Sequence, residues 1–192
     1  MKRLSKAHMS ELPNYQGLTL ASIYIVETEQ QAAEALSLLS QARVLGFDTE
    51  SKPTFKKGEK SAGPTLIQLA TPAHAFLFPA RFACALAAAG ELLGNGAIKK
   101  VGFGLKGDRK VLGSHLGLAL ENAQDLAIEL RKMIDDKNDI GAKAAVAMVL
   151  GQRLLKGAQL SNWGAYPLTK QQIEYAANDA HAAVCVAREI GI

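Results

Sequence analysis

Hydrophobic and polar positions along the 192-residue chain switch between the two-residue period of strands and the wider spacing of helices. Short runs rich in β-branched and aromatic residues predict strands, and apolar residues three to four positions apart predict helices. The expected strands cover residues 22–26, 43–49, 65–70, 74–78 and 98–103. The expected helices cover residues 28–40, 81–93, 108–116, 125–133, 141–150 and 169–190.

The order of these elements indicates the fold class. Strands come first, with a hairpin candidate that turns at residues 71–73, and helices and strands then alternate. This order predicts an α/β fold with a central mixed β-sheet of about five to six strands flanked by helices. We expect residues 1–21 to form an N-terminal tail and residues 22–192 to form a single domain.

Composition changes this picture little. Hydrophobic residues make up 48% of the chain and charged residues 21%, which is ordinary for one globular domain. The formal net charge of +4 is compatible with a polyanionic partner but does not require one. The chain has no apolar run of membrane-spanning length, and its basic start lacks the apolar stretch of a secretory leader. We therefore expect a cytoplasmic protein without a membrane partner, of unspecified oligomeric state.

Two carboxylates end the strand expected at residues 43–49. Because strand side chains alternate between faces, Asp48 and Glu50 point the same way. Two like charges that converge are unfavourable unless a cation neutralises them, and carboxylate oxygens suit Mg²⁺ or Mn²⁺. Taken alone, however, such a pair more often marks two solvated residues.

Three further positions carry candidate chemistry. Tyr175 and Asp179 lie four residues apart in the last expected helix, so they share one helical face. In isolation this spacing is typical of a packed tyrosine beside a solvated aspartate. Asp108 follows a glycine-rich turn at a helix start, where capping and the helix dipole explain an aspartate without any catalytic role.

Together and in this order, the motifs resemble those of the DEDD exonuclease superfamily. The sequence FDTE at 47–50 resembles the first motif, Asp108 after VGFGLKG the second, and Tyr175 with Asp179 in PLTKQQIEYAANDA the third. Glu174 occupies the position where the histidine-type subgroup carries histidine, which favours the tyrosine type.

Two accessory segments extend the resemblance over about residues 22–190. LIQLA and LGQRLLKGAQLSNW resemble stretches of the Werner-syndrome-type exonuclease domain and of the related ribonuclease D. The resemblance implies a ribonuclease-H-like fold and a metal-dependent 3′→5′ exonuclease. Such an enzyme acts on nucleic acid with a free 3′ end, as DNA or RNA, and releases nucleoside 5′-monophosphates.

The resemblance also implies roles for the motif residues. Two divalent cations, Mg²⁺ or Mn²⁺, would be held by the carboxylates of Asp48, Glu50, Asp108 and Asp179. Tyr175 would orient the attacking water.

Residues around these motifs are candidates for binding the substrate. They are Thr49, Lys52, Phe55, Lys106, Arg109 and Trp163. The basic side chains would neutralise phosphates, although solubility is the better explanation for any single lysine. Phe55 would stack on a terminal base, although packing of this loop phenylalanine onto the core explains it equally well. Trp163 is more simply explained by packing against the last helix.

Other functions fit parts of the sequence. Gly102-Phe-Gly104-Leu-Lys-Gly107 has the spacing of a dinucleotide-binding turn. We discount that reading because Lys99 and Lys100 interrupt the preceding strand, because Asp108 would lie near the pyrophosphate, and because the motif lies in mid-chain. A non-catalytic nucleic-acid-binding or scaffold protein on the same fold is a second alternative, and an endonuclease is a third.

Overall fold

A six-stranded sheet forms the centre of the computed structural model, which describes residues 2–53, 63–155 and 157–192. The strands are β1 (Ile23–Ile25), β2 (Val44–Ser51), β3 (Pro64–Ala70), β4 (Ala75–Pro79), β5 (Lys99–Gly102) and β6 (Ala123–Asp125). Their order across the sheet is β1-β4-β3-β2-β5-β6. β3 runs antiparallel to β2 and β4, and the remaining pairs are parallel. The predicted mixed sheet is confirmed.

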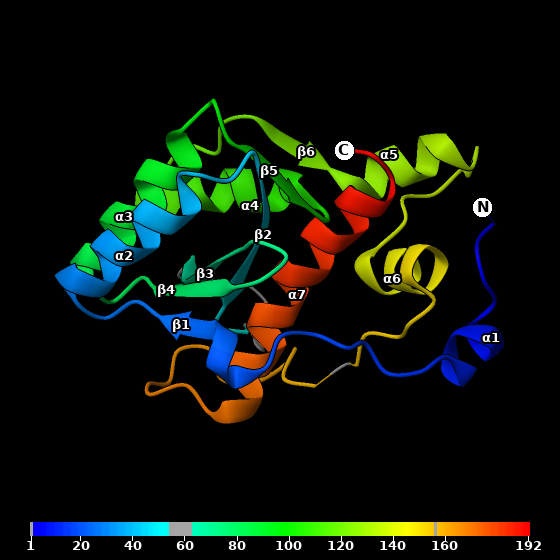
Figure 1. The fold of residues 1–192 in the computed structure, drawn as a ribbon, viewed down its shortest axis with the longest axis horizontal. Helices are drawn as coiled ribbons and strands as arrows, with labels where there is room; N and C mark the ends of the chain where they lie inside the picture. The colour runs from blue at the N-terminus through cyan, green and yellow to red at the C-terminus, as the bar shows by residue number, and fades with distance from the viewer. Residues whose placement is uncertain (1, 54–62, 156) are drawn as a thin grey trace.

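Helices cover both faces of the sheet (Figure 1). They are α1 (Lys6–Glu11), α2 (Glu29–Leu39), α3 (Ala83–Gly94), α4 (Leu105–Val111), α5 (Leu126–Met133), α6 (Ala142–Leu150) and α7 (Lys170–Glu189), with shorter turns at Leu20–Ser22 and Leu112–Leu116. Among the described residues, no helix combines the length and the apolar character needed to cross a membrane.

The alternation of β3 and β4 builds a separate core on each face. Leu66 and Leu77 pack with α5, α6 and α7, whereas Ile67, Leu69 and Phe78 pack with α2 and α3. Because neighbouring strand residues face opposite ways, each strand supplies both cores. A capping box begins both α2, where Thr28 pairs with Gln31, and α7, where Thr169 pairs with Gln172.

A close contact between α7 and β2 places the long last helix directly over the centre of the sheet. A Cβ atom at Gly46 would overlap the carbonyl oxygen of Ala180. The face of α7 that meets the sheet consists largely of small buried residues, including Ala176, Ala177 and Ala183. These small side chains allow the helix backbone to approach the strand, so residues that follow Gly46 on β2 lie beside α7.

Two features of the β5–β6 region differ from the sequence-based expectation. The short strand β6 is not predicted, because three residues provide too little periodicity to recognise. The predicted helix start at residue 108 is wrong, since α4 begins at Leu105. The first N–H groups of this helix are bound by a side chain from a distant part of the chain, Asp125, instead of by a local capping residue.

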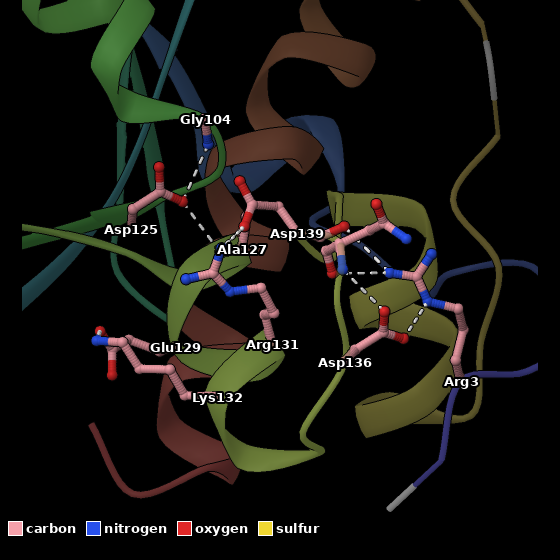
Figure 2. A network of polar contacts seen from close by, with 10 residues as sticks. Arg3, Gly104, Asp125, Ala127, Glu129, Arg131, Lys132, Asp136 and Asp139 are labelled. Atoms are coloured by element: carbon pink, nitrogen blue, oxygen red, sulfur yellow. Dashed lines mark hydrogen bonds and ion pairs between the residues drawn. The ribbon is translucent and has the colours of Figure 1, made fainter.

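The N-terminal residues contact the domain at several points. Arg3 pairs with Asp136 at 3.0 Å, and it also donates to the carbonyl oxygens of Asn138 and Asp139 (Figure 2). Arg131 on α5 pairs with the carboxylate of Asp139 at 3.0 Å. The residues after α1 then pass α6 and the base of α7 before they enter β1 (Figure 1).

Candidate active site

Three carboxylates meet where β2 faces α7. Asp48, Glu50 and Asp179 each offer an oxygen, and these three oxygens lie within 4.8 Å of one another. The alternation of β2 turns Asp48 and Glu50 to the same side. Asp179 comes from α7, which the contact of Gly46 with Ala180 holds against the strand. Sequence reasoning thus anticipated the residues that the fold brings together.

Asp108 lies beside this cluster, in the first turn of α4. Its Oδ1 accepts a hydrogen bond of 2.5 Å from the hydroxyl of Thr49. The charge of Asp108 contributes to the raised pKa values of Asp48 and Glu50, so the carboxylates interact electrostatically. The four acidic residues therefore form one acidic site, with Asp108 at its edge.

The acidic cluster strongly favours protonation when no cation is bound. Burial, followed by the charges of Asp179 and Asp108, raises the pKa of Glu50 to about 8. The same causes, with burial first, raise the pKa of Asp48 well above its ordinary value. Burial also raises the pKa of Asp179 to about 6, against the opposing effects of a Tyr175 hydrogen bond and the Lys143 charge.

A divalent cation would relieve this repulsion directly. The converging donors are all carboxylate oxygens, the hard ligands that Mg²⁺ and Mn²⁺ prefer. The geometry of Asp48, Glu50 and Asp179 therefore fits a divalent metal site.

Tyr175 lies one helical turn before Asp179 and shares a hydrogen bond with it. Burial and the neighbouring acidic charges raise the pKa of Tyr175, so its hydroxyl stays protonated at physiological pH. A neutral phenol at this position can donate one hydrogen bond and accept others. The indole of Trp163 packs near the Tyr175 ring, with their centroids 6.1 Å apart.

A cavity of about 550 Å³ opens over the carboxylates. Such a volume lies within the range of small-molecule sites in proteins. Several residues that sequence reasoning missed line it, namely Met9, Phe103, Lys143, Leu154, Leu155 and Gln159. No local pattern marks these residues, because they reach the cavity from separate elements.

The basic substrate-binding candidates lie outside this cavity. Lys52 follows β2, and Lys106 and Arg109 lie on α4; all three are exposed. Thr49 does line the cavity, and its hydroxyl donates a hydrogen bond to Asp108, which lies outside the lining. The cavity thus brings one of these four candidates to the carboxylates.

The aromatic candidates differ in placement. Trp163 is only 2% exposed and belongs to the core that packs under α7, which favours the packing explanation. Phe55 lies outside the described residues.

Backbone N–H groups of the glycine-rich turn at 102–107 are already hydrogen-bonded by a side chain from elsewhere in the protein. The Asp125 carboxylate accepts hydrogen bonds from Gly104 N at 3.1 Å (Figure 2) and from Leu105 N at 2.9 Å. These are the N–H groups that a dinucleotide pyrophosphate would need. The dinucleotide hypothesis therefore fails. The argument that lysines interrupt the preceding strand is nevertheless wrong, because Lys100 is fully buried on the parallel strand β5. Its Nζ donates a hydrogen bond to the carbonyl oxygen of Asn95 at 2.7 Å.

Comparison with solved structures identifies the fold. The Nibbler EXO domain of Aedes aegypti superposes with a TM-score of 0.79 at 23% identity, over 92% of this chain and 90% of that one. The RNase D of Trypanosoma brucei gives a TM-score of 0.78 at 23% identity, over 88% of this chain and 65% of that one. The predicted ribonuclease-H-like fold is confirmed.

Sequence comparison identifies the family. The bifunctional 3′-5′ exonuclease/ATP-dependent helicase WRN of Mus musculus is 31% identical over 156 residues, or 80% of this chain and 11% of that protein. The exonuclease mut-7 homolog of Homo sapiens is 32% identical over 183 residues, or 78% of this chain and 20% of that protein. The chain thus spans a small part of these relatives. A family model described as 3′-5′ exonuclease matches residues 23–191, and the chain belongs to this family of hydrolytic enzymes, as a member of its DEDDy type.

Proposed function

We propose that this chain is a metal-dependent exonuclease that removes nucleotides from the 3′ end of a nucleic acid and releases nucleoside 5′-monophosphates. The observation that carries the proposal is the convergence of three carboxylate oxygens within 4.8 Å, beside the Tyr175 hydroxyl, in an open cavity. A site that serves only to bind nucleic acid has no use for clustered carboxylates, because they repel phosphates.

Two divalent cations, Mg²⁺ or Mn²⁺, are the cofactors that this site would hold. Asp48, Glu50, Asp179 and Asp108 are the residues that would hold them. When bound, such ions stabilise the attacking and leaving oxygens of a phosphodiester.

The protein's own groups would position the reactants. The Tyr175 hydroxyl, protonated across the physiological pH range, would hydrogen-bond the attacking water and orient it toward the terminal phosphodiester. Thr49 would hold the Asp108 carboxylate in place through its hydrogen bond. Lys143, whose charge acts on Asp179, would attract a phosphate into the cavity that it lines.

The proposed substrate is a nucleic acid strand with a free 3′ end. The RNase D of Trypanosoma brucei has been solved as a complex with RNA U12, which supports a strand as the ligand of this fold. The exposed Lys52, Lys106 and Arg109 would contact phosphates further along such a strand. The choice between DNA and RNA depends on contacts with the 2′-hydroxyl.

The deciding experiment is degradation of 5′-labelled single-stranded DNA and RNA with Mg²⁺ or Mn²⁺, comparing the wild type with Asp179→Ala. We expect a ladder that shortens from the 3′ end in the wild type alone, lost with a chelator and restored by excess metal. Cleavage of a circular or 3′-blocked strand would indicate an endonuclease instead. A lack of cleavage at saturating metal, with binding retained, would support the non-catalytic alternative.

A further inference from the structure

The N-terminal segment, defined here as residues 9–18, is fastened to the loop that follows α6. Arg153 provides most of this attachment. Its Nε donates to the Asn14 side chain at 3.0 Å and its Nη1 to the carbonyl oxygen of Ser10 at 2.8 Å. Backbone hydrogen bonds join Arg153 N to the oxygen of Pro13 and Tyr15 N to the oxygen of Arg153. The segment is therefore held along its length.

The same segment also contacts α7 next to the acidic cluster. The Tyr15 hydroxyl and Nδ1 of His181 lie 2.8 Å apart, and Leu18 N donates to the Asn178 side chain at 3.1 Å. A Cβ atom at Gly17 would overlap the Asn178 side chain, so the backbone passes directly against the helix. Asn178 immediately precedes Asp179, which places the segment beside the proposed metal site.

A second cavity, of about 340 Å³, lies between this segment and α7. The N-terminal segment contributes residues 15–18 to its lining, and α7 contributes Gln171, Glu174 and Asn178. It shares four lining residues with the cavity over the carboxylates, namely Leu154, Leu155, Tyr175 and Asp179. The two cavities therefore adjoin at the Tyr175 ring.

The chemistry of the second cavity suits a nucleobase better than a phosphate. Among the described residues that line it, the charged side chains are Glu174 and Asp179, which are both acidic and would repel a phosphate. Its other walls combine apolar surface from Leu18, Leu154 and Leu155 with nearby side-chain amides. Apolar faces with hydrogen-bonding groups at the edge are what a flat base needs from a binding site.

Resting on the proposed function, we propose that this second cavity binds the base of the penultimate nucleotide, the one that becomes the new 3′ end after cleavage. The N-terminal segment forms one wall of that base site. The cavity over the carboxylates then receives the terminal nucleotide and the linkage to be cut. Residues 15–18 thus bind substrate in addition to their contacts with α7.

Photo-crosslinking tests the placement of the base. An oligonucleotide with 4-thiothymidine at the penultimate position is bound to the full chain with Ca²⁺ in place of Mg²⁺, irradiated, digested and mapped by mass spectrometry. We expect adducts within residues 13–18 or at Leu154, Leu155 or Gly157. Adducts that map only to other parts of the chain would overturn the proposal. This readout needs binding alone, so it remains informative if the wild type cleaves nothing and the proposed function fails.

Kinetics tests the contribution of the N-terminal segment. Arg153→Ala removes the side-chain attachments to Ser10 and Asn14, and Arg153 itself lines neither cavity. We expect the KM for an oligonucleotide to rise about three- to tenfold, with kcat for the p-nitrophenyl ester of thymidine 5′-monophosphate within about twofold of wild type. That ester has no penultimate base.

The matched control is Arg131→Ala, which removes an arginine ion pair with Asp139 and touches neither cavity. It should leave the KM for the oligonucleotide and the kcat for the ester unchanged. An unchanged oligonucleotide KM in Arg153→Ala, or an equal loss of kcat on both substrates, would show that the segment only supports the fold.

Discussion

The hydroxyl of Thr49 donates a hydrogen bond to Oδ1 of Asp108, joining the acidic motif of β2 to the first turn of α4. Strand alternation places Thr49 on the opposite side of β2 from Asp48 and Glu50. The motif therefore uses both faces of its strand, one for the carboxylate cluster and one to hold the fourth carboxylate. This contact gives the residue between the two acids a specific role.

Thr49→Val should weaken the binding of the metal without destroying the site. Valine keeps the shape of threonine but leaves Asp108 without its hydrogen bond, so the carboxylate loses its fixed orientation. We expect activity at limiting Mn²⁺ to fall about tenfold and to recover at saturating Mn²⁺, as for removal of a supporting contact around a metal site. Thr49→Ser retains the hydroxyl and should stay near wild type. A loss that saturating metal does not reverse would contradict this role.

Asp125 should prove important for stability and, through α4, for activity. Its carboxylate binds the N–H groups of Gly104 and Leu105 at the start of α4 and that of Ala127 at the start of α5. Asp125→Ala should lower the free energy of unfolding by roughly 1–3 kcal/mol, measured by urea denaturation. The matched control is Asp136→Ala, which removes an exposed ion pair with Arg3 and a hydrogen bond from Asn138 N and should cost clearly less. Equal losses in the two variants would argue against the double cap.

Short-range patterns explain which parts of the site could be predicted. The alternation of β2 places Asp48 and Glu50 on one side, and the four-residue spacing of α7 places Tyr175 with Asp179. The cap that Asp125 provides to Gly104 spans 21 residues, and no local rule connects the two positions. The same holds for residues that reach the cavity from separate elements, such as Met9 and Lys143.

Lys100 illustrates how a sound rule can mislead. A charged residue argues against a buried parallel strand, yet this lysine is fully buried on β5. Its amine caps the end of α3 by donating to the oxygen of Asn95 at 2.7 Å. Burial lowers the pKa of Lys100 to about 8, with the Glu121 charge opposing. The carbonyl oxygen of Asn95 satisfies the buried amine, and the sequence pattern alone does not reveal this contact.

The stability of the metal-free protein should fall as pH rises. The pKa values of Asp179, about 6, and Glu50, about 8, exceed their ordinary values, so the folded chain binds protons more tightly than the unfolded chain. Their stabilising contribution is full at acidic pH and is lost as pH rises through about 6 to about 8. In a chelator, the Tm should therefore decline between about pH 4 and about pH 8.

Mn²⁺ should reverse this decline, because the cation replaces the protons that the carboxylates release. The stabilisation by Mn²⁺ should accordingly grow with pH, as followed by thermal denaturation with and without chelator. The control is Glu50→Gln, which should flatten the pH dependence in chelator. An Mn²⁺ effect that is constant with pH would contradict carboxylate ligation.

Asp179→Asn and Tyr175→Phe should separate metal binding from water positioning, although the two side chains share a hydrogen bond. Asp179→Asn removes a proposed ligand and a repulsive charge, so it should weaken Mn²⁺ binding, raise the Tm in chelator and lower kcat by at least about 10³-fold.

Tyr175→Phe should keep Mn²⁺ affinity, measured by titration calorimetry, and lower kcat by roughly 10²-fold. Its Tm in chelator should fall slightly, because Asp179 loses a hydrogen-bond donor. The opposite signs of the two Tm changes follow from the acidic cluster itself: the carboxylate is a source of repulsion until a cation binds, whereas the phenol reduces that repulsion. If Tyr175→Phe lost Mn²⁺ binding while Asp179→Asn retained it, the proposed roles would have to be exchanged.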